Sequence, residues 1–199
     1  MEILNCVQGT DEWYAARLGM ITASCFSDVL AKGQGKTRDK YMKQLLAERI
    51  FNEREESYTN ACMERGKELE AEARCEYEKE LGVKVQQIGF ARMIDWVGAS
   101  PDGLIEDDGL LELKCPKGIT QLEVEKNGCV PSMYIPQVQG QMWVLNRKWC
   151  DFVSYHPKRD LFVRRVYADK DYIANLQKEV EIFISELQDL IKEYDKTIF

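Results

Sequence analysis

One stretch of the sequence, VGASPDGLIEDDGLLELKCPK at residues 97–117, places charged side chains inside an otherwise apolar segment. Two short apolar runs are separated by a Gly and two Asp, which is the pattern of two strands joined by a turn. Glu112 and Lys114 are two residues apart, so on a strand their side chains share one face, and the neighbouring leucines share the other. Charges on a buried face are costly unless they meet a counter-ion or each other. The stretch therefore predicts a hairpin built around a charged site.

A second carboxylate is close in the sequence, because Asp102 precedes Glu112 by ten residues (112 − 102). Two carboxylates suit a hard divalent cation, and Mg²⁺ commonly uses one or two of them together with substrate phosphates. Lys114 adds an ammonium group that orients a water or binds a phosphate. The alternative is a surface hairpin with a same-face Glu–Lys ion pair, and the spacing alone leaves both interpretations open.

The composition indicates one globular domain over residues 1–199. The chain carries a net charge of −7, with 45% hydrophobic and 31% charged residues. No apolar run approaches about 18 residues, and the N-terminus lacks a secretion-signal pattern. We therefore expect a cytoplasmic protein with no membrane partner. The acidic charge argues against a protein that coats nucleic acid, although it is compatible with a local basic channel.

The Cys and His content narrows the chemistry further. The seven Cys are odd in number and scattered, with no C-x-x-C pair, which disfavours zinc and disulfide frameworks. No Cys follows Cys150, which also disfavours an iron–sulfur cluster near the C-terminus. The single His, His156, lies in an expected turn. Carboxylate–metal chemistry is therefore favoured over His chemistry.

Apolar periodicity and turn residues predict the remaining elements. Helices are expected from Thr10 to Gly19, then within residues 22–30 with Thr22 or Ser24 as the N-cap, and at 41–50, 62–81, 136–146 and 170–197, with a linker or short helix at 119–130. Strands are expected at 83–85, 88–93, 96–99, 149–155 and 161–167. The last helix has a heptad-like apolar stripe, which most often packs on its own domain. In the helix 62–81, the expected buried stripe is Leu69, Ala73, Tyr77 and Leu81.

These residues carry a resemblance to a known family. Pro101-Asp102 with Glu112-Leu113-Lys114 resembles the PD-(D/E)XK nuclease signature. The longer wording SPDG…LELKCP is similar to the YqaJ/lambda-exonuclease branch of phage recombination exonucleases. The resemblance implies an α/β fold with a PD-(D/E)XK restriction-endonuclease-like core, in which helices flank a mixed central sheet. It also implies that Asp102, Glu112 and the Leu113 carbonyl hold metal ions, and that Lys114 is catalytic.

Two helical segments match further elements of this family. Residues 66–70, GKELE, match its Gly-Lys-x-x-Glu element, which implies Glu70 as a further metal-site carboxylate; Glu68 and Glu72 are the rivals if the register slips. Taken without the family, Glu70 is one acid among many on a solvated face. Tyr134 and Gln137 match its Y-x-x-Q-V-Q element, which implies that Gln137 positions the metal-bound water or the scissile phosphate. Gln141 falls one turn further on the same helix face.

The N-terminal segment contains a third match. Trp13…Arg17-Leu18-Gly19…Ile21-Thr22-Ala23-Ser24 is similar to the family's N-terminal motif. The resemblance implies that Arg17 and Ser24 bind the 5′-phosphate of a DNA end. The alternatives are a helix cap for Ser24 and a surface ion pair for Arg17.

A basic segment follows at residues 31–43. Its Gly35-Lys36-Thr37 is not a Walker phosphate loop, because position 30 is Leu instead of Gly, so we exclude a nucleotide triphosphatase. The basic residues either line a DNA path or belong to a solvated loop: Lys32, Lys36, Arg38, Lys40 and Lys43.

The family resemblance predicts a Mg²⁺-dependent 5′→3′ exonuclease of linear double-stranded DNA, with Mn²⁺ as a substitute metal. Such an enzyme releases mononucleotides from a 5′-phosphorylated end and leaves a 3′ single strand for recombination by strand annealing. The resemblance further implies a homotrimer ring and a single-strand annealing protein as partner. Two alternatives remain open at this stage: an endonuclease or nickase of the same fold, and a DNA-end-binding module without catalysis.

Overall fold

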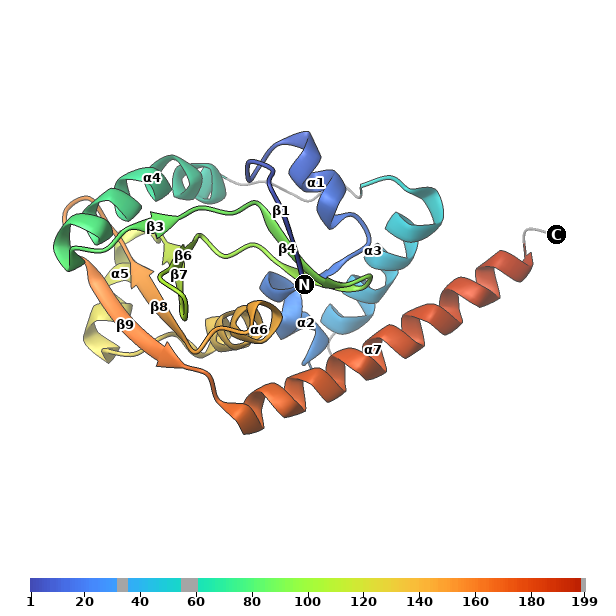
Figure 1. The fold of residues 1–199 in the computed structure, drawn as a ribbon. Helices are drawn as coiled ribbons and strands as arrows, with labels where there is room; N and C mark the ends of the chain where they lie inside the picture. The colour runs from blue at the N-terminus through green and yellow to red at the C-terminus, as the bar shows by residue number, and fades with distance from the viewer. Residues whose placement is uncertain (32–35, 55–60, 198–199) are drawn as a thin grey trace.

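The computed structural model describes residues 1–31, 36–54 and 61–197, which form two β-sheets with helices on their faces (Figure 1). The first sheet has the strand order β1-β4-β5-β2, with β1 at Glu2–Leu4, β2 at Ile21–Thr22, β4 at Phe90–Ile94 and β5 at Val97–Ala99. The second has the order β3-β6-β7-β8-β9, with β3 at Val85–Gln86, β6 at Gly103–Ile105, β7 at Gly109–Lys114, β8 at Trp149–Ser154 and β9 at Phe162–Tyr167. Both sheets mix parallel and antiparallel pairs.

Strand β7 is central in the second sheet, where it pairs antiparallel with β6 and parallel with β8. Its register places Leu111 opposite Asp151 and Glu112 opposite Phe152. Because side chains alternate along a strand, Glu112 and Phe152 lie on one face of the sheet and Leu111 lies on the other. The expected hairpin and its charged face are confirmed, and β7 is a buried strand, not a surface one.

Helices cover both faces of this sheet. The helices are α1 at Asp11–Arg17, α2 at Phe26–Val29, α3 at Thr37–Phe51, α4 at Ala61–Leu81, α5 at Gly118–Asn127, α6 at Ile135–Leu145 and α7 at Lys170–Thr197, with 3₁₀ turns η1 at Ala23–Cys25 and η2 at Ser132–Tyr134. Tyr77 of α4 packs with Leu111 on one face, and Met142 of α6 belongs to the cluster that contains Phe152 on the other.

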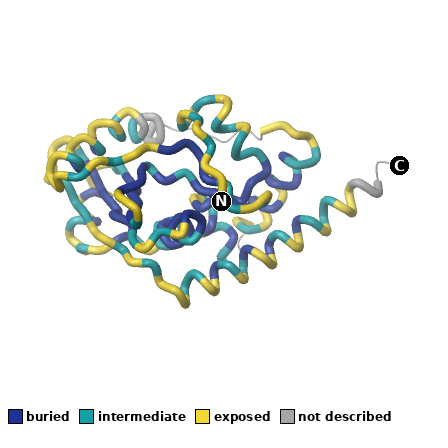
Figure 2. The backbone as a smooth tube through the Cα atoms, viewed as in Figure 1, coloured by how far each residue is buried: buried dark blue, intermediate teal, exposed yellow. Residues whose placement is uncertain are grey.

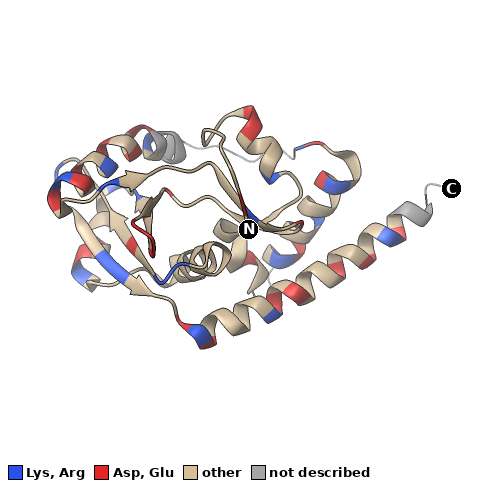
Figure 3. Ribbon diagram, in the orientation of Figure 1, with Lys and Arg blue, Asp and Glu red and all other residues tan. Residues whose placement is uncertain are grey.

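Helix α6 is the most buried of these helices and the one on which the site depends. It is almost wholly dark blue in Figure 2, and in Figure 3 it carries none of the charged colours seen on α4 and α7. Gly140 lets it approach α2 closely, since a Cβ at this position would lie 2.2 Å from the Phe26 ring. The long α7 packs against α3, and its C-terminal part extends beyond the rest of the ribbon (Figure 1).

Most of the expected elements are confirmed, with two differences. Helix α3 begins at Thr37 instead of residue 41. Of the two alternatives for residues 119–130, the structure has the short helix, α5. Leu81 is 41% exposed and does not extend the buried stripe of α4, because it is the last residue of the helix, before the left-handed Gly82. In the part of the chain that the structure describes, no helix is long and apolar enough to cross a membrane.

Candidate active site

Asp102 lies just before β6, at the end of β7 that carries Lys114. Its backbone N–H donates to the Leu111 carbonyl at 3.1 Å, and its Oδ2 accepts from the Leu113 N–H at 2.5 Å. The N–H and C=O of one strand residue point to the same side, so the Leu113 carbonyl faces the edge at which Asp102 lies. The hairpin thus brings the Asp102 carboxylate and a main-chain carbonyl oxygen together.

Glu112 is a buried carboxylate, only 1% exposed, and three side chains donate to it. Its Oε1 accepts from Lys114 Nζ and from Gln137 Nε2, each at 2.5 Å. Its Oε2 accepts from Gln141 Nε2 at 2.7 Å. The two glutamines come from α6, one turn apart, so this helix and β7 together solvate a charge that water does not reach.

Lys114 is held at the more open side of this group. Its ammonium also lies 5.1 Å from the ring of Tyr134, which in turn packs on Phe152. Burial alone would lower the pKa of Lys114, but the charges of Glu112 and Asp102 and the hydrogen bond to Glu112 raise it overall. The ammonium is therefore a fixed positive charge beside two carboxylates.

The predicted acid of α4, Glu70, and its rivals Glu68 and Glu72 have different surroundings. Burial first, and then the charges of Glu112 and Glu70, raise the pKa of Asp102 well above its ordinary value of 3.8. Glu72 instead accepts a hydrogen bond from Tyr155 at 2.6 Å, and Glu68 is exposed. Glu70 is therefore the α4 acid whose charge acts on the site.

The donor set fits a hard divalent cation. Asp102, Glu112 and the Leu113 carbonyl would supply oxygen ligands, and burial together with the charges of Glu112 and Glu70 raises the pKa of Asp102, as in a site that a cation would stabilise. Within the residues that the structure describes, no three His, Cys, Asp or Glu side chains come together as a metal cluster. Glu70 thus acts on Asp102 through its charge, without closing a three-carboxylate cluster, and Mg²⁺ accepts such a sparse set because it keeps water ligands.

A second polar group forms at the end of α1. Arg17 donates to Ser100 Oγ at 3.3 Å and to Thr22 Oγ1 at 3.5 Å, and Thr22 Oγ1 lies 3.1 Å from Ser24 Oγ. The guanidinium stacks on Trp13 at 4.2 Å, and burial lowers the pKa of Arg17. Among the described residues it forms no ion pair with a carboxylate. The structure thus brings the two predicted phosphate ligands, Arg17 and Ser24, to one place.

Neither alternative for these two residues is seen. Ser24 lies inside η1, whose N-cap Thr22 makes no side-chain cap hydrogen bond. Arg17 hydrogen-bonds hydroxyl groups instead of a surface acid. A half-buried guanidinium surrounded by hydroxyls is well suited to a phosphate, since it retains donors for an anion.

The segment before Asp102 connects this group to the carboxylates. Ser100 Oγ accepts from Trp13 Nε1 at 2.9 Å as well as from Arg17. The next carbonyl, that of Pro101, accepts from Gln8 Nε2 at 2.9 Å. Asp102 follows directly, so the N-terminal segment fixes the chain that carries it. Sequence reasoning gave no role to Ser100 or Gln8, because their partners are 83 to 93 residues away.

Arg65 is another residue whose contact was not predicted. From α4 it donates to the carbonyls of Cys115 and Pro116, at 3.1 and 3.2 Å, immediately after Lys114. It therefore braces the end of β7 from the helix that also carries Glu70. A lone Arg in a charge-rich helix gives no sequence signal for such a contact.

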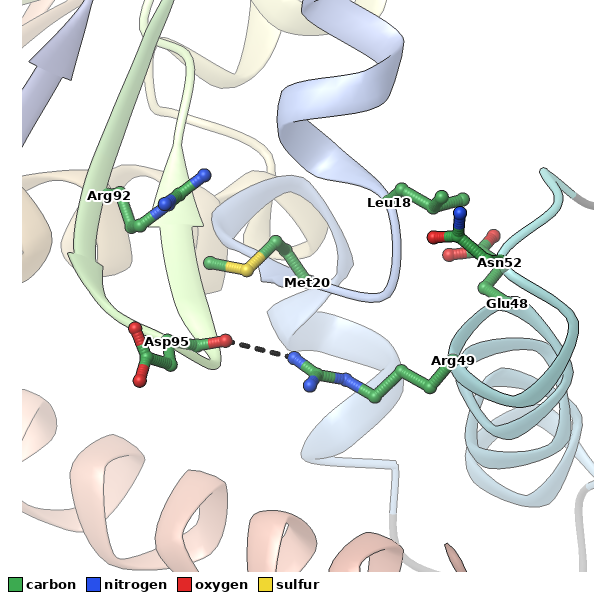
Figure 4. Close-up of a pocket in the computed structure, with 7 residues that line it drawn as sticks. All are labelled: Leu18, Met20, Glu48, Arg49, Asn52, Arg92 and Asp95. Atoms are coloured by element: carbon green, nitrogen blue, oxygen red, sulfur yellow. Dashed lines mark hydrogen bonds between the residues drawn. The ribbon is translucent and has the colours of Figure 1, made fainter.

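The turn between α1 and β2 is braced at a pocket that holds none of the predicted site residues (Figure 4). Arg49 of α3 stacks on Trp96 at 3.5 Å and donates to the Gly19 and Asp95 carbonyls, at 2.7 and 2.9 Å. Gly19 has φ +64, and a Cβ there would lie 2.7 Å from Arg49. Glycine is therefore required at the turn that holds Arg17 and Thr22 in place.

The basic segment divides into residues with different surroundings. Lys36 and Lys40 line a pocket that also includes Cys25, the neighbour of Ser24. Arg38 instead pairs with Glu186 of α7 at 2.6 Å, and Lys43 pairs with Asp39 at 2.8 Å. Lys32 lies outside the described residues. Two lysines of the proposed DNA path thus lie near the Arg17 group, while Arg38 and Lys43 are engaged elsewhere.

Comparison with solved structures defines the class of the protein. The chain is similar to an alkaline exonuclease, LHK-Exo, from Laribacter hongkongensis, with 40% identity and a TM-score of 0.89 over 95% of this chain and 98% of that one. A structure of LHK-Exo in complex with dAMP gives 40% identity and a TM-score of 0.90, with the same coverage. A phage-related exonuclease from Haemophilus somnus 129PT shares the fold. It is 15% identical, with a TM-score of 0.68 over 88% of this chain and 96% of that one. The protein is a nuclease with the PD-(D/E)XK type of fold.

The family follows from the sequence match. Residues 12–148 match the YqaJ-like viral recombinase domain. This range contains the Arg17 group, α4, the hairpin and α6, and the chain belongs to this family. No protein with a curated description matches it.

Asp102→Asn is expected to stabilise the metal-free protein, because it removes one of the mutually repelling buried charges. In EDTA at neutral pH, the free energy of unfolding measured with urea should rise above that of the wild type. The raised pKa fixes the sign of the pH dependence. As the pH rises from 3.8 towards the folded-state pKa of Asp102, the wild type should lose stability relative to the variant.

Asp107→Asn is the matched control, since Asp107 is an exposed acid in the turn of the same hairpin. It should leave the free energy of unfolding within about 0.5 kcal/mol of wild type. A clear loss of stability in Asp102→Asn under these conditions would contradict the electrostatic description of the site.

Proposed function

We propose that the protein is a Mg²⁺-dependent 5′→3′ exonuclease that degrades one strand of linear double-stranded DNA from a 5′-phosphorylated end. Its products would be mononucleotides and a 3′ single strand for recombination by strand annealing. One observation carries the proposal: the segment Ser100–Asp102 joins the Arg17 guanidinium to the carboxylates of the hairpin, and among the described residues Arg17 has no carboxylate partner. A site that holds a terminal phosphate beside a metal site selects the end of a strand.

The metal would be held by Asp102, Glu112 and the Leu113 carbonyl, with Glu70 contributing charge or a further ligand. Bound Mg²⁺, or Mn²⁺ in its place, would supply positive charge to the attacking and leaving oxygens of an in-line displacement, in the two-ion arrangement common to nucleases. Oxygen-only ligands, together with the unrelieved negative charge at Asp102, support this assignment.

Lys114 and Gln137 lie on the more open side of Glu112, where a substrate phosphate has access. In the proposed reaction, Lys114 orients the attacking water and helps it lose a proton, and Gln137 positions the water or the scissile phosphate. Charge accumulates on the phosphate oxygens in the transition state, so the fixed Lys114 ammonium stabilises that state more than the ground state.

Arg17 and Ser24 would hold the 5′-phosphate and thereby set both polarity and cutting position. The hydroxyl-lined, unpaired guanidinium is the support for this role. Lys36 and Lys40 would continue the path along the backbone. LHK-Exo, which is 40% identical, is described in complex with dAMP. A mononucleotide bound to such a relative supports mononucleotides as the product here.

The function is tested with a linear duplex that carries a 5′-phosphate at one end and a 5′-hydroxyl at the other. The wild type should release mononucleotides from the phosphorylated end with Mg²⁺ and none with EDTA. Lys114→Ala should reduce the rate by at least about 100-fold, the loss expected when one preorganised group that stabilises transition-state charge is removed, while duplex binding is retained. Retained cleavage would remove Lys114 from the mechanism.

A covalently closed circular plasmid separates the proposal from the rival nuclease activity. An end-dependent exonuclease leaves the circle intact, whereas an endonuclease or nickase converts it to open or linear forms. If neither substrate is cut while linear duplex is bound, the protein is an end-binding module, and the catalytic part of the proposal is wrong.

Arg17→Met should remove the preference for a phosphorylated end while leaving the metal site intact. The ratio of kcat/KM between 5′-phosphate and 5′-hydroxyl duplexes should fall by about tenfold or more, the loss expected for a charge-assisted contact worth about 1.5–3 kcal/mol. The hydroxyl duplex is the internal control, because a variant that merely loses folded protein slows both substrates equally. An unchanged ratio would place the phosphate elsewhere.

The proposal extends to assembly and partners. A homotrimer ring around the DNA would make digestion processive, and a single-strand annealing protein would load on the exposed 3′ strand in the cytoplasm of a bacterial or phage-infected cell. Sedimentation velocity should give three times the 23.1 kDa of one chain. A monomer at working concentration would overturn the ring without affecting the chemistry of cleavage.

A further inference from the structure

The two oxygens of Glu112 have different surroundings. Oε1 accepts from Lys114 and Gln137, both of which are partly exposed and can turn to water or substrate if a cation takes this oxygen. Oε2 accepts from Gln141, which is 1% exposed and belongs to the interior of α6. The donors on one oxygen thus reach solvent, whereas the donor on the other is enclosed in the protein.

Gln141 is itself only half satisfied. Its Nε2 donates to Glu112, whereas its buried Oε1 is without a hydrogen-bond partner among the described residues. The opposite orientation of the amide would aim an oxygen at a carboxylate, so the N–H must face Glu112. A buried acceptor without a hydrogen bond lowers the stability of the fold, and an apolar side chain at this position would not have this cost. The contact with Glu112 is therefore the one interaction that explains a glutamine here.

We propose that Gln141 is a positioning residue that restricts Glu112 to one-oxygen coordination of the metal and thereby sets a preference for Mg²⁺ over Ca²⁺. This inference rests on the proposed function, in which Glu112 is a metal ligand. Gln141 touches neither substrate nor metal and acts only through the carboxylate.

The restriction follows from the burial of Gln141. A cation bound by both carboxylate oxygens would compete with the Gln141 N–H for Oε2, and the displaced amide, enclosed in α6, would find neither water nor another acceptor. Ca²⁺ commonly takes both oxygens of a carboxylate and a larger set of ligands, whereas Mg²⁺ takes six ligands in strict geometry and keeps several waters. Holding Oε2 therefore disfavours Ca²⁺, whereas Mg²⁺ needs only Oε1, whose donors Lys114 and Gln137 are partly exposed and can give up the contact.

The test uses the DNA-free, full-length protein and measures the Kd of Mg²⁺ and of Ca²⁺ separately by isothermal titration calorimetry. Gln141→Met keeps the length of the side chain without the amide, and Gln141→Asn keeps an amide that is one methylene too short to reach Oε2. Gln139→Met is the matched control. Gln139 is also buried in α6, but it bonds the Tyr167 carbonyl and the Asp169 N–H, away from Glu112.

In both Gln141 variants the ratio of the Ca²⁺ Kd to the Mg²⁺ Kd should fall by about tenfold, the lower end of the effect of losing a group that orients a metal ligand. Ca²⁺ should also inhibit Mg²⁺-dependent cleavage at correspondingly lower concentration. Gln139→Met should keep the wild-type ratio, whatever its stability. An unchanged ratio in both Gln141 variants, or equal weakening of both metals, would overturn the inference.

Glu112→Gln distinguishes failure of this inference from failure of the proposed function. If the wild type binds neither metal, or if Glu112→Gln binds Mg²⁺ as the wild type does, the metal site itself is wrong. If Glu112→Gln loses Mg²⁺ and the Gln141 variants keep the wild-type ratio, the metal site stands and only the role of Gln141 is wrong.

Discussion

The structure depends on keeping a charged Glu112 inside the protein. A carboxylate that is 1% exposed is tolerated only where hydrogen-bond donors replace the water it has lost. One donor, Lys114, comes from the same strand face, and two come from α6. This requirement explains why α6 lacks charged residues yet carries glutamines at spacings of one turn. Its other positions pack against the core, and its amides complete the environment of the carboxylate.

The same requirement ties the N-terminal segment to the sheet. Gly140 allows α6 to lie against Phe26, directly after the turn that contains Ser24. From the other side, Trp13 and Arg17 hold Ser100, two residues before Asp102. The phosphate-binding candidates and the carboxylates are therefore parts of one packed unit. A shift of α1 would be transmitted to Asp102 through the hydroxyl of Ser100.

The sequence predicts the local parts of this arrangement and misses the distant ones. The alternation around Glu112 and Lys114, the Gly82 stop and the long helix 170–197 are set by neighbouring residues, and the structure confirms them. The motif resemblance singled out Arg17 and Ser24, and the structure places them close together without the helix cap or the surface ion pair. Their roles in phosphate binding stay predictions. The contacts of Ser100 and Arg65 could not be predicted from the sequence, because they join segments that are 50 or more residues apart. The prediction that Leu81 is buried was wrong, because Leu81 is the last residue of α4 and periodicity does not show where the buried part of a helix ends.

The carboxylate group and the Arg17 group carry opposite charges, which suggests the order in which DNA and metal bind in the proposed enzyme. Asp102 lies within reach of the charges of Glu112 and Glu70 and of one ammonium, Lys114, so carboxylates outnumber the cation in this group. A phosphodiester is repelled by such a group at short range, where the interior screens weakly. The Arg17 group carries the opposite sign and has no carboxylate partner among the described residues, so in the proposed function it would attract a terminal phosphate independently of the metal. In the proposed enzyme, a DNA end is therefore held at Arg17 whether or not metal is present, and the scissile phosphate settles beside Glu112 only once cations have neutralised the carboxylates. In the proposed enzyme, recognition of the DNA end would thus depend on the positive Arg17 group, and cleavage on neutralisation of the neighbouring carboxylates.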